Sequence, residues 1–225
     1  MRQKPRYRRM LPHIHLPEKD YSLVYRLAGS LPRSIIQEIQ QEYQYSLREI
    51  EHNQTGSERK KSVIELREAI QKKYDRYLDQ AKYGPTWLAR PEIAQIVKDS
   101  IHYIEEKFGF WKVWAYCIMS NHVHLEVTLE PKAPLLQVIM QRHKGFTANQ
   151  SNRRLERTGP FWQAETFDRF IRNEHDFFRR ILYTLNNPVK AGLVEHWQEW
   201  PHIYICPSIQ QEITGIRAEH GPPGP

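Results

Sequence analysis

The sequence predicts a mixed α+β protein, because strand-like and helix-like segments both recur along its 225 residues. The strand-like runs, at residues 21–27, 111–118 and 122–129, are rich in β-branched and aromatic side chains. The helix-like segments, of which residues 32–50 are the first, carry apolar side chains three and four positions apart. A chain of this length can bury a substantial core and form one domain with an elaboration.

Charge and cysteine content limit the classes of function. The formal net charge is +7 and the pI is about 9.4, which favours an anionic partner, nucleic acid first and a membrane surface second. No apolar run approaches the roughly 20 residues of a membrane helix. The basic segment 1–20 has no apolar stretch behind it, so we interpret it as an arm and not as a secretory signal. Cys117 and Cys206 form no disulfide framework, so we expect a cytoplasmic protein without membrane association.

The N-terminal half is predicted to contain one strand and three helices. Residues 21–27 alternate well enough between apolar and polar side chains for a strand. Two helical stripes within residues 30–90, separated by a break at residues 52–56, predict a helical hairpin. We interpret this hairpin as an insertion that is dispensable for chemistry but affects substrate choice or solubility. A further helix is expected to begin at Pro91 and end at Gly109.

The C-terminal half is predicted to alternate between strands and helices. A helix at residues 134–149 follows the third strand, and residues 161–163 are predicted to open a short strand. Residues 173–187 carry a capping residue, an apolar stripe and a terminating proline, which predict another helix. Residues 201–225 end in a run of glycine and proline and are predicted to be a disordered tail. The main domain is therefore expected to span residues 21–200.

Two histidines mark the unusual face of one predicted strand. Side chains alternate between the faces of a strand, so His122 and His124 share one face while Val123 lies on the other. Their Cα atoms are expected about 7 Å apart, which lets two imidazoles converge on one ion or one phosphate. Glu126 shares this face, so a His-x-His-x-Glu metal site, or a supporting role for Glu126, stays open. A second histidine pair near the N-terminus is flanked by prolines and is interpreted as part of a surface loop.

A tyrosine lies away from the apolar stripe of its predicted helix. At about 100° per residue, the apolar residues of segment 173–187 form one stripe, and Tyr183 falls roughly opposite to it. Asn187, one turn later, and Arg180 share the face of Tyr183. Most tyrosines are structural, so a tyrosine placed beside an amide and a guanidinium needs an explanation.

A local excess of basic residues follows the histidine strand. Only Glu156 is acidic in this part of the chain, and the basic members are Arg142, Lys144, Arg153, Arg154 and Arg157. Together with Arg180, this group is the best candidate for contacts with DNA phosphates, and the alternative is a solvated helix face.

Several motifs occur in one order along the chain. They are Ile118-Met119-Ser120-Asn121-His122-Val123-His124, Lys144-Gly145-Phe146-Thr147-Ala148, Gly159-Pro160-Phe161-Trp162-Gln163, Phe167-Asp168-Arg169, and Tyr183 followed by Asn187-Pro188-Val189-Lys190-Ala191-Gly192-Leu193-Val194. In this combination the chain resembles a REP-associated tyrosine transposase, a branch of the single-tyrosine HUH transposases. The resemblance runs from about residue 21 to about residue 194.

The resemblance implies a fold, a site and a substrate. The family fold is an antiparallel sheet with helices packed mainly on one face, similar to a ferredoxin or RNA-recognition domain. In the family, two histidines and a polar residue of the tyrosine helix bind a divalent metal, which corresponds to His122, His124 and Asn187 here. Oxygen and imidazole ligands suit Mg2+ or Mn2+. The resemblance further implies that Tyr183 is the nucleophile. A monomer or homodimer would then cut single-stranded hairpin DNA through a 5′-phosphotyrosine intermediate.

Two features depart from the family pattern, and two other functions stay open. Residues 30–90 are longer than in the smallest members, and the third ligand is Asn187 where related insertion-sequence transposases have Gln. The residues also allow a basic nucleic-acid-binding module without catalysis. A metal-dependent hydrolase that uses His122, His124 and Glu126 with an activated water is the other alternative. A covalent protein–DNA adduct distinguishes these functions, because attack by water leaves no adduct and simple binding cleaves nothing.

Overall fold

A computed structural model describes residues 18–220 of the chain, and it describes side chains as far as residue 213. The basic arm predicted at residues 1–20 therefore lies almost entirely outside the described residues. Within the described range, no helix is both long enough and apolar enough to cross a lipid bilayer.

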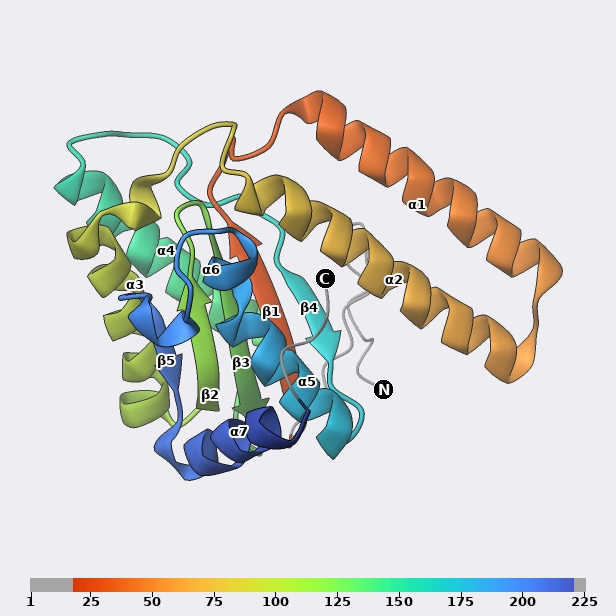
Figure 1. Cartoon of the computed structure of the whole chain (residues 1–225). Coiled ribbons are helices and arrows are strands. Elements are labelled where there is room, and N and C mark those ends of the chain that lie inside the picture. The colour runs from red at the N-terminus through yellow and green to blue at the C-terminus, as the bar shows by residue number, and fades with distance from the viewer. Residues whose placement is uncertain (1–17, 221–225) are drawn as a thin grey trace.

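The described residues form an antiparallel sheet of five strands in the order β4-β1-β3-β2-β5 (Figure 1). The strands are β1 (Asp20–Arg26), β2 (Trp111–Ile118), β3 (His122–Leu129), β4 (Phe167–Phe170) and β5 (Ile203–Ile205). β3 is central, because it pairs with β1 along most of its length and with β2 through a tight turn at residues 119–121. The predicted α+β class with an antiparallel sheet is confirmed.

Helices cover both faces of the sheet (Figure 1). One pair packs on the face that carries the apolar side chains of β3, and the other pair packs on the opposite face. These pairs are α3 (Pro91–Tyr103) with α4 (Leu136–Arg154), and α5 (Glu174–Leu185) with α7 (Pro207–His220). Helices were expected mainly on one face of the sheet, and α3 and α4 lie on such a face. The opposite face is covered as well, because α5 has an apolar stripe of its own to bury.

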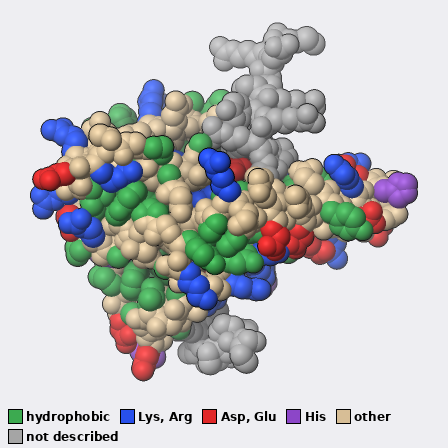
Figure 2. All heavy atoms as spheres, turned by 90° about the horizontal axis from the view of Figure 1, so that it is seen from above, with side chains coloured by type: hydrophobic (Ala, Val, Ile, Leu, Met, Phe, Trp, Pro, Cys, Tyr) green, Lys and Arg blue, Asp and Glu red, His purple; other side chains and the backbone are tan. Residues whose placement is uncertain are grey.

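The predicted helical hairpin is present as α1 (Arg33–Asn53) and α2 (Gly56–Asp79), which project together from the body (Figures 1 and 2). The C-terminal end of α2 is not peripheral. Tyr74 and Leu78 are buried in one cluster with Val24 of β1, so this end of the helix packs on the sheet. The interpretation of the whole hairpin as an insertion separate from the domain core therefore needs correction at the end of α2.

Local sequence explains how the helices of the second half begin and end. Asn173 caps α5 by accepting a 2.9 Å hydrogen bond from the backbone N–H of Asp176. The helix after Pro91 ends at Gly109, whose φ of 56° is the left-handed conformation that glycine adopts easily. The remaining short helices are α6 (Asn187–Lys190), the π-helix Ile104–Phe108, and the 3-10 helices Trp87–Ala89 and Trp197–Glu199.

Two sequence-based predictions about the second half are wrong. Residues 161–163 form no strand in the structure; Trp162 makes an isolated bridge to Leu27, and β4 is the edge strand. The expected disordered tail is ordered in its described part, because β5 pairs with β2 and Ile209 of α7 is buried. The sequence of β5 and α7 resembles a loop because β5 has only three residues. The residues that β5 and α7 pack against come from distant parts of the chain. The last five residues, 221–225, lie outside the described range.

Candidate active site

The two histidines of the strand motif meet in the centre of the sheet. His122 and His124 project from the same face of β3, as the alternation predicted, and both are completely buried. Their Nε2 atoms lie 3.0 Å apart. The cross-strand neighbours of His124 are Val24 on β1 and Cys117 on β2, so strands flank the pair on both sides.

A neighbouring asparagine fixes the tautomer of one histidine. Nδ2 of Asn121 donates a 3.0 Å hydrogen bond to the backbone carbonyl of Leu78, which leaves Oδ1 facing Nδ1 of His122 at 2.7 Å. An amide oxygen can only accept, so His122 carries its proton on Nδ1 and presents a lone pair at Nε2. The 3.0 Å contact between the two Nε2 atoms fits either a hydrogen bond from His124 or two lone pairs that share one cation.

Burial keeps both imidazoles neutral. It lowers the pKa of His122 to about 3 and is the main cause that holds the pKa of His124 well below its ordinary value. Neutral imidazole is the form that binds metal ions. Two Nε2 atoms 3.0 Å apart are close enough for both to reach one cation.

Tyr183 approaches the histidine pair from α5. Its ring centroid lies 6.0 Å from that of His124, and its hydroxyl donates a 2.7 Å hydrogen bond to Oδ2 of Asp75 on α2. The Lys190 ammonium lies 3.6 Å from the ring centroid, and the Arg180 guanidinium lies 4.7 Å from it. Burial and the adjacent Asp75 raise the pKa of Tyr183 above its ordinary value. Removal of the hydroxyl proton therefore requires an acceptor within the site.

Asn187 lies at the start of α6, one turn after Tyr183, and is completely buried. Its Nδ2 donates to the backbone carbonyls of Tyr183 and Thr184 at 2.8 and 3.3 Å. This orientation leaves Oδ1 buried without a hydrogen-bond partner among the described residues. A buried amide oxygen without a partner is destabilising unless it meets a cation or a donor. The amide of Asn187 therefore fits a metal ligand.

Two carboxylates of α2, Asp75 and Asp79, lie at the site although the sequence did not predict them there. Oδ1 of Asp79 lies 3.6 Å from Nε2 of His122. Burial is the main reason why the pKa of Asp75 rises to about 6 and that of Asp79 to about 7, and Asp75 adds to the rise for Asp79. Gln71, Asp75 and Asp79 recur at every fourth residue beside the apolar stripe of α2, and this spacing is the signal of a second, polar face. The polar composition of the helix concealed it, because such helices are usually solvated.

Glu126 links the sheet to α5 and does not complete a metal site with the histidines. Its Oε1 accepts hydrogen bonds from Ser22 at 2.9 Å and from Thr184 at 2.7 Å. In the part of the chain that the structure describes, no group of three or more His, Cys, Asp or Glu is arranged to hold a metal ion. The His-x-His-x-Glu site is thus not formed, and Glu126 instead anchors the helix that carries Tyr183.

Two of the predicted DNA contacts are internal. The Lys144 ammonium donates to the backbone carbonyls of residues 163–165 and to the hydroxyl of Thr166, at 2.6 to 3.2 Å. Arg180 is buried and donates to the hydroxyl of Ser22 through Nε and Nη2. The Lys144 ammonium is engaged within the protein, so the prediction that it contacts DNA is wrong. Contact of Arg180 with DNA stays a prediction, because its guanidinium lies 4.7 Å from the ring of Tyr183. Lys144 holds a loop in place, and Arg180 contributes positive charge within the site.

The other predicted DNA contacts lie nearer the surface. Arg142, Arg153 and Arg154 are exposed on α4, and the half-buried Arg157 stacks its guanidinium 4.0 Å over the ring of Trp87. Figure 2, which views the molecule from above, shows Lys and Arg side chains spread over the body among hydrophobic ones. A role in DNA binding stays a prediction for these four arginines.

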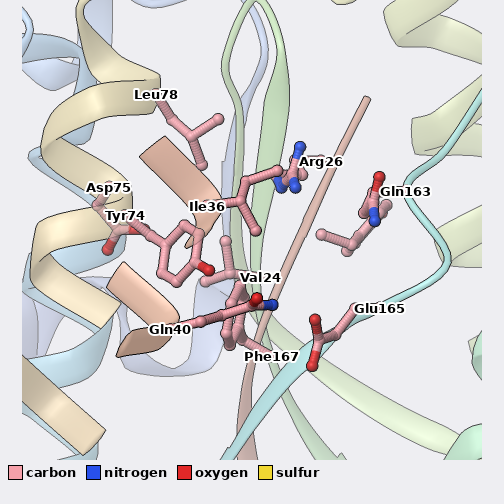
Figure 3. A pocket seen from close by; sticks show the side chains of 11 residues that line it. Val24, Arg26, Ile36, Gln40, Tyr74, Asp75, Leu78, Gln163, Glu165 and Phe167 are labelled. Carbon is pink, nitrogen blue, oxygen red and sulfur yellow. The ribbon is translucent and has the colours of Figure 1, made fainter. Parts of the chain in front are cut away.

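A small cavity lies between α2 and β1, next to the carboxylate that accepts the tyrosine hydrogen bond (Figure 3). Its volume is about 50 Å³, and its lining includes Arg26, Tyr74, Asp75 and Glu165. This space has room for a few water molecules. Water can therefore lie close to Asp75.

Comparisons with known proteins show which transposases this chain is similar to. Residues 65–170 match the family described as "Transposase IS200 like". The matched segment contains both histidines, whereas Tyr183 and Asn187 lie beyond it. A protein of Haemophilus influenzae described as a REP-associated tyrosine transposase is 28% identical over 108 residues, which cover 44% of this chain and 61% of that protein. The chain thus spans about three fifths of the length of this relative.

A solved structure is also similar. It is that of a REP-associated tyrosine transposase bound to a REP hairpin, and it matches with a TM-score of 0.52 and 15% sequence identity. The alignment covers 89% of this chain and 82% of the other, and at this identity it concerns the fold. The chain is therefore similar to the IS200-like transposases over residues 65–170, and the proteins it resembles are REP-associated tyrosine transposases.

Proposed function

We propose that the protein is a metal-dependent endonuclease and strand transferase that acts on single-stranded DNA at hairpin-forming repeats. The observation that supports this most is the position of Tyr183, whose ring centroid lies 6.0 Å from that of the neutral, buried His124. Relationship to a transposase family favours a DNA-processing enzyme. The REP hairpin bound by the structurally similar protein suggests the class of substrate.

His122, His124 and Asn187 would hold a divalent cation, Mg2+ or Mn2+. The donors fit this role, because the histidine nitrogens lie 3.0 Å apart and the amide oxygen of Asn187 has no partner among the described residues. When bound, the cation would polarise the scissile phosphate and offset the charge that develops on it. This set of ligands carries no charge, which preserves the electrophilic character of the cation.

Tyr183 would attack the scissile phosphorus with its hydroxyl oxygen. The bond from phosphorus to the 3′ oxygen of the upstream nucleotide breaks, so the downstream strand stays on the protein through its 5′ phosphate. A phosphotyrosine conserves the energy of the phosphodiester, and a later 3′-hydroxyl can therefore rejoin the strand without ATP. Lys190 and Arg180, which flank the ring, would add positive charge near the phosphate.

A hairpin oligonucleotide labelled at either end tests this proposal with the full chain and Mn2+. On a denaturing gel, the downstream label should migrate with the protein and the upstream label should not. Tyr183→Phe should form no adduct, because phenylalanine has no atom that can attack phosphorus. Cleavage without an adduct would support the metal-dependent hydrolase, and binding without cleavage would support the inactive binding module. An adduct in Tyr183→Phe would assign the nucleophile to another tyrosine, of which Tyr116 would be tested first.

A further inference from the structure

We infer that Asp75 of α2 is a catalytic residue that takes the hydroxyl proton of Tyr183 when the strand is cut and returns it when the strand is rejoined. This inference rests on the proposed function and extends it. It adds an acid–base group from a helix that lies more than 100 residues before the tyrosine.

The position of Asp75 is defined by the packing of α2. Tyr74 and Leu78, its neighbours on the helix, are buried against the sheet, so the backbone of this turn is fixed. The side chain of Asp75 is 2% exposed, and Oδ2 lies 2.7 Å from the hydroxyl of Tyr183. Oδ1 has no hydrogen-bond partner among the described residues. The carboxylate is thus aimed at the reacting oxygen and is held away from bulk solvent.

Electrostatics favour one shared proton between the two groups. Burial raises the pKa of Asp75 to about 6 and also raises the pKa of Tyr183. The charged groups that face Asp75 are Arg180 and Lys190 from the α5–α6 segment, and Asp79 from its own helix. A tyrosinate and a carboxylate 2.7 Å apart would repel each other strongly in a buried site. The proton therefore stays on the tyrosine until its oxygen begins to bond to phosphorus. From then on, loss of the proton no longer leaves a full negative charge on that oxygen.

The cutting step balances with these groups and water. The bond between the Tyr183 oxygen and phosphorus forms, and the bond between phosphorus and the upstream 3′ oxygen breaks. The hydroxyl proton passes to Oδ2 of Asp75, and the departing 3′ oxygen takes a proton from water. In the rejoining step a 3′-hydroxyl attacks the phosphotyrosine and loses its proton to water. The tyrosine oxygen then leaves phosphorus and takes its proton back from Asp75, which acts as a general acid.

Asp75→Asn removes the proton acceptor and keeps the shape of the side chain. The amide oxygen of asparagine can still accept the hydrogen bond of the tyrosine, so the ring should keep its position. Asp99→Asn on α3 is the matched control. It removes the same charge as Asp75→Asn, but α3 packs on the opposite face of the sheet. The rate of adduct formation is measured in single-turnover reactions with excess full-length protein, Mn2+ and a labelled hairpin oligonucleotide.

We expect the rate to fall at least 100-fold at pH 7 in Asp75→Asn, while hairpin affinity is unchanged and Asp99→Asn reacts as the wild type does. The wild-type rate should rise with pH as Asp75 ionises and then level off. The Asp75→Asn rate should instead keep rising at high pH, where hydroxide removes the tyrosine proton. A fluorinated tyrosine at position 183, whose hydroxyl is more acidic, should restore part of the rate in Asp75→Asn.

The outcomes separate this inference from the proposed function. A wild-type protein that forms no adduct refutes the proposed function itself. A wild-type adduct together with a normal rate in Asp75→Asn refutes only the inference. A lowered rate with the wild-type pH profile and no gain from the fluorinated tyrosine would also overturn it, because Asp75 would then position the ring without moving a proton.

Discussion

Replacing Asp75 with asparagine should stabilise the folded protein at neutral pH. The carboxylate is almost completely buried, and burial outweighs the favourable effects of Tyr183, Arg180 and Lys190 on its ionised form. The folded protein therefore keeps an ionised Asp75 at neutral pH only at the expense of stability. Asparagine has a similar shape and no charge, so it removes this destabilisation.

The magnitude follows from the pKa of Asp75, which rises from 3.8 to about 6 on folding. Each unit corresponds to about 1.4 kcal/mol, so the ionised carboxylate lowers the free energy of unfolding by about 3 kcal/mol. The raised pKa means that the folded state binds this proton more tightly than the unfolded state does. Stability from this group is thus fully present below about pH 4 and is lost as the pH rises through about 6. The advantage of Asp75→Asn should appear over the same range.

Urea unfolding from pH 4 to pH 7.5 measures this difference, with Asp99→Asn as the control for loss of charge. We expect wild type and Asp75→Asn to be about equally stable at pH 4. At pH 7.5 the variant should be more stable by about 3 kcal/mol, or about 6–12 °C in thermal midpoint for a chain of this size. A difference that does not change with pH, or a less stable variant at pH 7.5, would refute the argument. In the latter case Arg180 and Lys190 would stabilise the carboxylate more than burial destabilises it.

Three further predictions test the other assignments. Lys144→Met should lower the free energy of unfolding, measured in urea, by about 3–5 kcal/mol, because buried carbonyls lose a charged donor. Arg142→Met, on the exposed side of the same helix, is the control and should change the free energy of unfolding by less than about 0.5 kcal/mol. His124→Ala should abolish adduct formation in Mg2+ with little change in hairpin affinity by filter binding. Asn187→Ala should slow the reaction less, since water can replace one neutral ligand, and normal cleavage by His124→Ala would exclude the metal site. Ending the chain at residue 206 should lower the free energy of unfolding by about 3–5 kcal/mol, because Ile209 and Ile213 are removed from the core. An unchanged unfolding midpoint would show that α7 is not part of the core.

The histidine face and the tyrosine face could be predicted because both depend on local geometry. Alternation along a strand places His122 and His124 on one face whatever the strand pairs with. Helical periodicity likewise separates Tyr183 from the apolar stripe of α5. The order of the motifs gave the resemblance to a transposase family, and this resemblance predicted the antiparallel sheet. These predictions use spacing within a single element, where the sequence carries the information directly.

The roles of Lys144 and Asp75 could not be predicted because they depend on contacts between distant elements. Lys144 belongs to a basic stretch of sequence, and only the fold shows that its ammonium is enclosed by the carbonyls of residues 163–165. Asp75 lies in a polar helix that has the composition of a solvated arm. Its burial comes from the packing of α2 on β1 and from the tyrosine of α5. Partners of this kind are set by tertiary structure and leave little trace in local composition.

The exposed groups around the site show on which side it lies nearest to solvent. The histidine pair is completely buried, and the sheet lies beneath it. Tyr183 is half-buried, Asp79 keeps 18% of its side chain exposed, and Lys190 is exposed above the tyrosine ring. A phosphate that enters between α2 and α6 would therefore meet the Lys190 ammonium first and the tyrosine hydroxyl next. One wall of this entrance is the end of α2, so a phosphate on this path would also pass the carboxylates of Asp75 and Asp79.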